Sequence, residues 1–397
     1  MKLDALIIGG GPAGATTALL LAKAGWSVGL IEKKRFPRRK VCGEFLSATN
    51  LPLLQKLGMA EFYLSHSGPE VRRVGLYTAD TVVTSAMPLV GSSIARGGRA
   101  LGREHLDTAL LHEAQAYGAH IWQPAEAKTL QPKANEFTCT FRDGNGTKEL
   151  SAAVIVMANG SWEKQVGRPD SKDHKPSDLL AFKAHFLNAN LPSDLMPLLA
   201  FPGGYGGLVH SDHQRVTLSC CIRRDTLHNL RSDYPGLSAG EAVLQYLMAH
   251  CRGVRETLIQ AERQGNWLAA GPIRPGIRHC YKDHQFFVGN LAGEAHPVVA
   301  EGISMAMQSA WLLSQTLIAH KNEILTGKGL NNAGADYTKQ WRKHFVKRIH
   351  AAAVFARLAM MAPWANSLLL PLVKQFPGIL TFGAKLSGKI QQVLPIE

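Results

Sequence analysis

No apolar run in this sequence approaches the roughly 20 residues that a membrane-spanning helix needs. Nor do residues 1–8 resemble a secretion leader, because they read as a strand and lack an apolar core followed by a cleavage site. The six cysteines contain no Cys-x-x-Cys pair and no metal-ligand spacing. We therefore expect free thiols, no bound metal and a cytoplasmic protein.

Acidic residues are scarce, with 30 Asp and Glu against 44 Lys and Arg. The net charge of +14 favours anionic partners such as anionic lipid, acidic substrates or nucleic acid. A nucleic-acid motif and alternating aromatic and basic residues are both absent, so we expect no nucleic-acid partner. The imbalance is greatest in residues 338–397, which hold nine Lys or Arg and a single acid, Glu397.

The C-terminal region, residues 331–397, has apolar segments typical of helices. We expect interruptions at Arg357, Pro363, Pro371 and Pro377. Packing against the core is the favoured role of this region. The alternative is peripheral membrane contact, in which its basic, apolar surface lies on anionic lipid.

The beginning of the chain carries the strongest signal. An apolar strand, Leu3–Ile8, is followed by the turn Gly9–Gly14, by an Ala/Leu-rich helix to Lys23 and by a second strand, Val28–Ile31. Glu32 follows directly, at the tip of that second strand. The order strand, tight turn, helix, strand and terminal acid predicts a dinucleotide-binding unit rather than an ordinary glycine turn.

Each residue of this unit has a physical role. Gly9 permits the tight turn, Gly11 lets a pyrophosphate approach the backbone, and Gly14 allows close packing of helix and strand. The free N–H groups and the positive dipole end of the helix attract phosphate. Glu32 is placed to accept ribose hydroxyls. The residues expected at the cofactor are Gly9, Gly11, Pro12, Ala13, Gly14, Glu32 and the first residue of the following basic run, Lys33.

The rest of the chain divides into segments of different character. We expect a helix over Arg103–Tyr117 and a buried strand, Ala153–Ala158, that ends on Asn159 and Gly160. Residues 165–280 are mostly strand-like and predict an inserted antiparallel lobe, with a glycine-rich link, Phe201–Gly207, between two of its strands.

A second half of the cofactor site follows this lobe. A strand, Phe286–Gly289, precedes Asn290, whose amide can donate and accept hydrogen bonds. After a Gly/Ala/Pro loop, Gly302 begins a long helix whose N-terminus places positive potential beside any group that becomes negative, as the ring of a reduced flavin does.

The sequence here resembles a known superfamily. The stretches Gly9–Glu32, Ala153–Gly160 and Val288–Met307, together with the motif Arg103-x-x-Leu106-Asp107, are similar to those of the FAD-dependent para-hydroxybenzoate hydroxylase and geranylgeranyl reductase superfamily. The resemblance covers most of residues 1–320. It implies that Arg103 reaches the FAD linker, that Asn290 lies on the ribityl or pyrophosphate region, and that Gly302 and Ile303 lie beside the isoalloxazine.

The resemblance also implies an α/β fold. A glutathione-reductase-like FAD-binding Rossmann domain would comprise residues 1–164 and 281–330, with some substrate-lobe strands within 60–100. An antiparallel β-sheet substrate lobe would comprise 165–280, and a helical tail 331–397.

Two positions depart from the superfamily pattern. Its usual Asp-Gly is Asn159-Gly160 here, and its Gly-Asp is Gly289-Asn290. Asparagine keeps the hydrogen bonding but loses a charge, so FAD binding is still expected, with Asn159, Gly160 and Asn290 among the cofactor-binding residues. The first change weakens the case for conventional NAD(P)H docking, because that motif serves reductant binding in the hydroxylases. No second Gly-x-Gly-x-x-Gly is present, so any NAD(P)H would bind transiently, and an external donor is equally open.

Cys42-Gly43-Glu44 resembles the Cys-Gly-Glu segment of geranylgeranyl-reductase-like proteins, in which the cysteine lies near the flavin. We therefore place Cys42 and Gly43 at the cofactor, and nearby cations would favour the thiolate form. The alternative is a small buried hydrophobic residue.

Three further side chains are candidates for contact with substrate: Tyr205, His210 and His296. Tyr205, His296 and Cys42 are the catalytic candidates. For Tyr205 and His210 the alternative is a structural side chain whose polar tip is satisfied, and for His296 it is a residue that only shapes the turn. The Trp-x-Trp-x-Ile-Pro motif of flavin halogenases is absent, which argues against halogenation.

Three functions remain open. The first is an FAD-dependent monooxygenase that hydroxylates an aromatic or lipophilic substrate through a flavin C4a-hydroperoxide. The second is an FAD-dependent reductase or dehydrogenase of an isoprenoid or polyketide C=C bond, which the Cys-Gly-Glu segment favours. The third is a flavin-binding redox partner without turnover.

Overall fold

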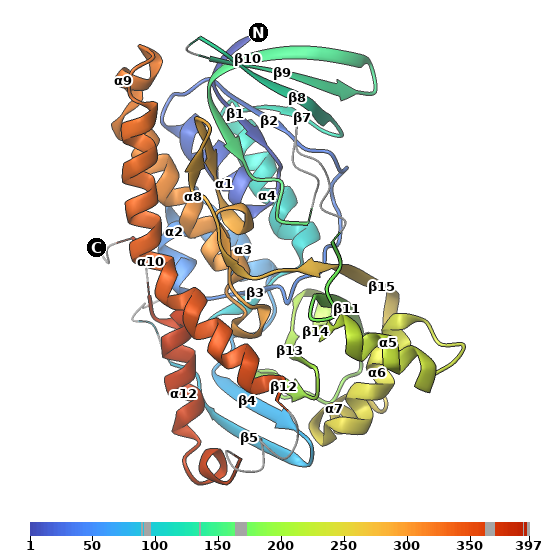
Figure 1. Ribbon diagram of the computed structural model, residues 1–397. Helices are drawn as coiled ribbons and strands as arrows, with labels where there is room; N and C mark the ends of the chain where they lie inside the picture. The colour runs from blue at the N-terminus through green and yellow to red at the C-terminus, as the bar shows by residue number, and fades with distance from the viewer. Residues whose placement is uncertain are drawn as a thin grey trace.

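The computed structural model describes residues 1–88, 90, 97–134, 136–162, 173–361, 370–391 and 393–394. Two large β-sheets and three groups of helices make up this part of the chain (Figure 1). Pro363 and Glu397 lie outside the described residues.

The first sheet is built around five parallel strands. Their order across the sheet is β18 (Gln285–Phe287), β10 (Gly146–Met157), β1 (Lys2–Ile8), β2 (Val28–Ile31) and β7 (His120–Trp122). The strands β1 and β2 and the second half of β10 are almost entirely buried, which explains their continuous apolar sequences. Antiparallel strands extend the sheet at its edges, namely β17 (Tyr281–Lys282), β8 (Glu126–Lys133) and β9 (Glu136–Asp143).

Helix α1 (Pro12–Lys23) packs against α4 (Arg103–Ala116) and α8 (Gly302–Ala319). Its first residue is a proline, which suits the first helical turn because no partner for an N–H is needed there. Gly25, at a φ of +72°, ends the helix as the sequence predicts. The three helices hold the loops that face the second sheet.

The second sheet has seven strands and is antiparallel apart from one parallel pair, β12 with β4. The order is β15 (Glu262–Ile273), β11 (Leu179–Leu187), β14 (Val216–Arg223), β13 (Gly204–His210), β12 (Leu195–Phe201), β4 (Arg73–Thr78) and β5 (Thr81–Ala86). Helices α5 (Arg224–Asp233), α6 (Ala239–His250) and α7 (Arg252–Leu258) pack on this sheet around a separate apolar core.

The glycine-rich segment Phe201–Gly207 is a hairpin rather than a link between two distant strands. Phe201 ends β12, Pro202 and Gly203 turn, and β13 begins at Gly204. Gly204 and Gly206 lie so close to neighbouring strands that an added Cβ would come within 2.2 Å of Phe201 and 2.7 Å of the Ser219 carbonyl, respectively. Close strand packing, not a loop, therefore accounts for these glycines.

Shorter elements connect the sheets. The two-residue strand β3 (Phe45–Leu46) pairs with β6 (Arg99–Ala100), and β16 (Gly276–Ile277) pairs with β19 (Gly293–Glu294). The remaining short helices are α2 (Leu51–Leu57), α3 (Ala60–His66) and α9 (Lys321–Leu325), with single turns at Ala48–Asn50, Asp212–Gln214, Gly289–Leu291 and Pro297–Val299.

The C-terminal region is helical, but its boundaries differ from those expected. Helix α10 (Leu330–Ala359) runs for 30 residues, so the interruption expected at Arg357 is wrong. Arginine is a good helix former and carries its charge to the surface here. Residues 370–375 are also helical despite Pro371, which falls in the first described turn, and α12 (Gly378–Ala384) begins after Pro377. Among the described residues, no helix combines the length and apolarity that crossing a membrane requires.

Candidate functional site

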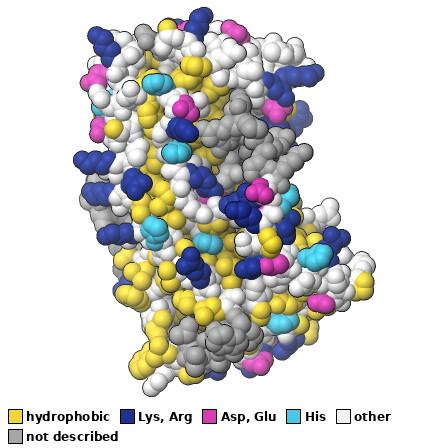
Figure 2. All heavy atoms as spheres, in the orientation of Figure 1, with side chains coloured by type: hydrophobic (Ala, Val, Ile, Leu, Met, Phe, Trp, Pro, Cys, Tyr) yellow, Lys and Arg dark blue, Asp and Glu magenta, His cyan; other side chains and the backbone are white. Residues whose placement is uncertain are grey.

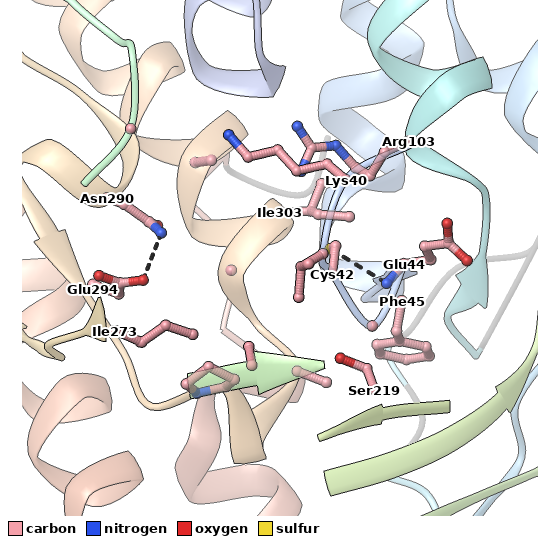
Figure 3. A pocket seen from close by; sticks show the side chains of 18 of the residues that line it. Lys40, Cys42, Glu44, Phe45, Arg103, Ser219, Ile273, Asn290, Glu294 and Ile303 are labelled. Atoms are coloured by element: carbon pink, nitrogen blue, oxygen red, sulfur yellow. Dashed lines mark hydrogen bonds between the residues drawn. The ribbon is translucent and has the colours of Figure 1, made fainter. Parts of the chain in front are cut away.

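One continuous pocket lies between the two sheets and is lined by residues from both (Figure 3). Its first end is formed by the turn before α1, its middle by the loop of residues 38–45 and the N-terminal end of α8, and its far end by β12, β13 and β14. The sequence-predicted residues in its lining are Gly11, Pro12, Ala13, Glu32, Cys42, Gly43, Arg103, Asn159, Gly160, Tyr205, Asn290, Gly302 and Ile303. The fold thus brings together residues that the sequence separates by about three quarters of the chain.

The glycines before α1 have two distinct roles. A Cβ at Gly14 would lie 1.9 Å from the carbonyl oxygen of Gly9, and Gly9 itself has a φ of +110°. Gly11 differs, because the nearest atom to an added Cβ is a terminal nitrogen of Arg103 at 3.6 Å. Gly9 and Gly14 are therefore needed by the fold, whereas the open side of Gly11 leaves room for a ligand against the backbone.

Glu32 sits under this turn. One carboxylate oxygen accepts the Gly10 N–H at 2.7 Å and the other accepts the Lys34 N–H at 2.7 Å. Each carboxylate oxygen has a further lone pair, so these bonds leave acceptor capacity for a sugar hydroxyl. Lys33 lies elsewhere: its ammonium pairs with Glu126 at 3.0 Å on the surface and is not part of the pocket lining.

Arg103 is fixed beside the turn by Asp107. Its guanidinium donates to both carboxylate oxygens of Asp107 at 2.6 Å, one helical turn away. Burial would lower the pKa of Arg103, but Asp107 and then Cys42 raise it, so the cation is permanent. The spacing Arg-x-x-x-Asp therefore produces a rigid bidentate pair that holds a positive charge next to Gly11.

Cys42 interacts with Arg103 and lies near Ile303, which is in the first turn of α8 (Figure 3). Its sulfur accepts the Glu44 N–H at 3.3 Å, and the thiol is partly exposed in the pocket. The other cysteines are buried, and burial raises the pKa of Cys220, which also lines the pocket, to about 12. Among the cysteines, Cys42 alone combines partial exposure with a neighbouring cation.

Glu44 is a site residue whose role sequence reasoning missed. It is 1% exposed and has a φ of +63°, which is uncommon outside glycine. Its carboxylate pairs with the buried ammonium of Lys183, and accepts from His185 at 3.0 Å and from Thr217 at 2.6 Å. Burial alone would raise the pKa of Glu44, but Lys183 and His185 outweigh it and hold the pKa well below its usual range. The Cys-Gly-Glu loop is thereby tied to β11 and β14.

Glu294 is a second residue that the sequence did not indicate. The amide of Asn290 donates to it at 2.8 Å, and the Ser161 hydroxyl and the Arg278 guanidinium donate at 2.8 and 3.3 Å. The pair lies across the pocket from Cys42 (Figure 3). Burial raises the pKa of Glu294 despite Arg278. In the sequence, Glu294 is marked only by its position four residues after Asn290. Asn290 is therefore not an acid itself but is hydrogen-bonded to one.

Several lining residues have open space above the backbone. A Cβ added at Gly43 or Gly302 would meet nothing within 4 Å, and one at Gly160 would meet only the Lys40 ammonium at 3.8 Å. Gly302 begins α8, where unpaired backbone N–H groups face the pocket. With the open side of Gly11, these positions form a cradle along the pocket that suits an extended dinucleotide with its ring at α8.

The far end of the pocket is mostly apolar. Tyr205 lines it and shares a 3.1 Å hydrogen bond with His296, which lies behind the lining. Burial raises the pKa of Tyr205 well above 10 and lowers that of His296 to about 4, so both are neutral at pH 7. His210 lies outside the lining and bonds the Leu191 carbonyl at 2.7 Å. The other lining residues at this end include Phe45, Ala181, Met196, Leu198, Leu208, Val209, Ser219, Cys220, Cys221, Ile273 and Val298.

A separate group, His105, Asp212 and His213, places three ligand atoms within 4.8 Å of one another. The Asp212 carboxylate already accepts from the Gly102 N–H at 2.5 Å and pairs with the buried Arg215. Asp212 therefore stabilises the start of α4, and we assign no metal to this group of residues.

Comparison with known proteins agrees with this geometry. Residues 2–216 match the model of the family described as "FAD binding domain". A tryptophan 2-halogenase of Chondromyces crocatus is 46% identical over 362 residues, covering 86% of this chain and 65% of the halogenase. Digeranylgeranylglycerophospholipid reductase 2 of Methanothermobacter thermautotrophicus is 21% identical over 90% of this chain and 88% of its own length.

Among solved structures, the flavin-dependent brominase Bmp2 has a TM-score of 0.76, at 18% identity, over 98% of this chain and 94% of its own. At that identity the likeness shows the shared fold alone. The chain spans less than two thirds of the length of several of the curated relatives that it matches.

Proposed function

Because the chain belongs to the FAD-binding domain family, we propose that it is an FAD-dependent monooxygenase that oxidises an apolar, aromatic or lipophilic molecule. The observation that supports this most is the single pocket, which joins the dinucleotide cradle at Gly11 to the apolar face of β12–β14. A substrate on that face would lie beside the N-terminal end of α8, where the cradle ends.

Bound FAD would supply the redox chemistry, and the chain would supply position and electrostatics. Gly11, Arg103 and the first turn of α1 would hold the pyrophosphate, and Glu32 the ribose. Gly302 and Ile303 would lie beside the ring, where the dipole of α8 favours developing negative charge.

The far end of the pocket would bind the substrate. Its aliphatic and aromatic lining offers water few hydrogen-bond partners, which protects reactive oxygen species from side reactions. The Tyr205 hydroxyl and Ser219 are the polar groups available there to orient a substrate heteroatom. His296 stays neutral at pH 7 and would orient the Tyr205 hydroxyl through their shared hydrogen bond.

The test begins with FAD-reconstituted protein, reduced photochemically under argon and mixed with oxygenated buffer. The probes are phenol, indole and pyrrole derivatives, each with and without bromide. A product that has gained one oxygen supports the proposal. A bromide-dependent product would instead show halogenation, which the similarity to a tryptophan halogenase favours and the missing Trp-x-Trp-x-Ile-Pro motif does not. Bound FAD that no probe affects would support the redox partner without turnover.

A second function is favoured by one specific observation. Cys42 lies in the pocket beside Arg103, in a Cys-Gly-Glu loop fixed by Glu44, and a relative named as a reductase matches 90% of the chain. This arrangement supports reduction of an isoprenoid or polyketide C=C bond. Anaerobic reoxidation of reduced enzyme by menaquinone-4, with a product that keeps two added hydrogens in its side chain after the quinol ring is reoxidised in air, would identify this activity and exclude an oxygen requirement.

A last part of the proposal concerns the source of the electrons that reduce the flavin. No second nucleotide-binding turn is present in the sequence, so NADH or NADPH would bind only transiently. Comparing the flavin reduction rates with NADH, NADPH and a reduced flavodoxin distinguishes a direct nicotinamide donor from an external protein donor.

A further inference from the structure

We propose that the C-terminal segment is a docking surface for an anionic lipid bilayer. The side chains concerned are the lipid-facing surface, defined as Val354, Leu358, Leu372, Phe376, Ile379, Phe382, Leu386 and Ile390. Each is exposed, with Phe376 at 54% and Phe382 at 61%. Large exposed hydrophobic side chains are otherwise scattered singly over the described residues, so this concentration needs an explanation.

The exposed side chains follow helical spacing on neighbouring elements. Val354 and Leu358 are one turn apart on α10, and Ile379 and Phe382 are three residues apart on α12. The two helices touch, because a Cβ added at Gly383 would lie 3.6 Å from the Phe355 ring. Hydrophobic side chains gather along the lower left edge of the molecule, where α12 lies (Figures 1 and 2).

The charges within the C-terminal segment itself have one sign. No acidic residue occurs between Asp336 and Glu397, whereas Arg357, Lys374 and Lys385 are exposed within or beside the lipid-facing surface. A second copy of this chain would bring an equally basic face against it, which like-charge repulsion disfavours. An anionic bilayer satisfies both features, since acyl chains accept the apolar side chains and headgroups pair with the cations.

The other side of α12 leads to the pocket. Leu380 and Ala384 pack on an apolar cluster that includes Phe45, Met196 and Val209, and these three line the pocket. Docking would therefore set the apolar end of the pocket next to the bilayer, so that a membrane-dissolved substrate has a short route to it. This last step rests on the proposed function, whereas the docking itself does not.

The segment is also fixed to the N-terminal end of α8. The Lys389 ammonium pairs with the buried carboxylate of Glu301 at 2.6 Å and lies 4.4 Å from the centre of the Phe45 ring. Glu301 is the residue before α8 begins. The lipid-facing surface is thus held in one orientation relative to the pocket.

Vesicle flotation of the full-length holoprotein tests the docking. The probes are vesicles of phosphatidylcholine alone and of phosphatidylcholine with phosphatidylglycerol. We expect binding only to the anionic vesicles, weakened by high salt. The variant Phe376→Ser/Phe382→Ser should lower the partition coefficient at least tenfold, while Leu237→Ser/Ile259→Ser, which removes equally exposed side chains from another face, leaves it unchanged. Unaltered FAD content and melting temperature show that each variant is folded.

Two results would overturn the proposal. One is an equal partition of the wild-type protein and the Phe376→Ser/Phe382→Ser variant, since the lipid-facing surface would then play no part. The other is a wild-type dimer, seen by light scattering, that the same substitutions dissociate without changing vesicle binding; the surface would then be a self-association interface. Neither measurement depends on turnover, so they remain informative if the proposed function fails.

Discussion

At the scale of single residues, Gly11 separates cofactor binding from folding. A Cβ added at Gly11 would meet no protein atom closer than 3.6 Å, so the fold tolerates a side chain there. A pyrophosphate bound against the Gly11 backbone would collide with that side chain. We expect Gly11→Val to lose nearly all bound FAD, measured by absorbance after gel filtration, while the melting temperature of the apoprotein stays within a few degrees. Gly14→Ala is the matched comparison and should fail to fold, because its Cβ would lie 1.9 Å from the Gly9 oxygen. A strongly coloured Gly11→Val protein would contradict the cofactor assignment.

The buried cluster around Glu44 predicts that removing one of its charges strongly lowers the free energy of unfolding. Lys183→Met removes the main partner of a carboxylate that is 1% exposed. Breaking a buried pair from one side typically costs about 3–5 kcal/mol. Urea unfolding should show a loss of this size, and Lys183→Met/Glu44→Gln should recover part of it because no unpaired charge remains. If the single variant loses less than about 1 kcal/mol, the cluster is not the clamp that its geometry indicates.

The same cluster predicts how stability depends on pH. The folded-state pKa of Glu44 lies below its value in the unfolded chain, so the unfolded state binds its proton first as the pH falls. The contribution of Glu44 is complete above its unfolded pKa of about 4.3 and is lost progressively below it. Between pH 6 and pH 3 the wild-type protein should therefore lose more stability than Glu44→Gln, which has nothing to titrate there. Parallel pH profiles of melting temperature would contradict this.

What the sequence reveals about single residues depends on where their partners lie. Gly11 and Glu32 could be singled out because they belong to one strand–turn–helix unit, whereas Arg103 was indicated by the resemblance of its motif to a known superfamily. Glu44 was not, since its partners Lys183 and Thr217 lie more than 130 residues further along the chain. The sequence motif drew attention to Cys42, whereas the structure shows that the neighbouring acid fixes the loop.

At the scale of elements, the apolar periodicities predicted β1, α1, α4 and α8 closely, because those segments have uniform patterns and clear ends. The hairpin of β12 and β13 was missed because close packing requires glycine where strand propensity would place bulky residues. Helix α10 was expected to break at Arg357, yet its buried face, with Tyr337, Trp341 and Phe345, sustains the helix. Close packing decided the hairpin, whereas in α10 the buried face and the helix propensity of arginine act together.

The link between the C-terminal segment and α8 gives the prediction at this scale. Lys389→Met leaves the Glu301 carboxylate buried without its cation at the start of α8. We expect a loss of about 3–5 kcal/mol in urea unfolding and faster proteolysis after residue 370, because the anchor of the segment is gone. Lys385→Met is the matched control, since Lys385 is exposed and four residues away, and it should behave as the wild-type protein does. Equal protease resistance of both variants would show that the pair does not anchor the segment.

At the scale of the whole molecule, the resemblance places some substrate-lobe strands within residues 60–100, but the sequence does not say which strand they pair with. Residues 73–86 add two strands to the second sheet through a parallel contact of β4 with β12, and no local pattern specifies that neighbour. The consequence is that the pocket draws its walls from both sheets, each with its own apolar core. A ligand that fills the pocket would therefore contact both units, which the Glu44–Lys183 pair and helix α10 already connect.

This joint lining predicts a cooperative effect of the cofactor on stability. Removing FAD should lower stability by about 2.7 kcal/mol relative to protein at a free FAD concentration a hundredfold above Kd, because FAD binds the folded state alone. Since the cofactor would contact both halves, calorimetry of the holoprotein should show one transition, and the apoprotein two that are resolved in temperature. Gly11→Val should resemble the apoprotein even with excess FAD, since it blocks the cradle without altering either core. If the two transitions keep the same separation in the presence of FAD, the cofactor contacts only the first sheet. The proposal that the substrate binds on the β12–β14 face would then be wrong.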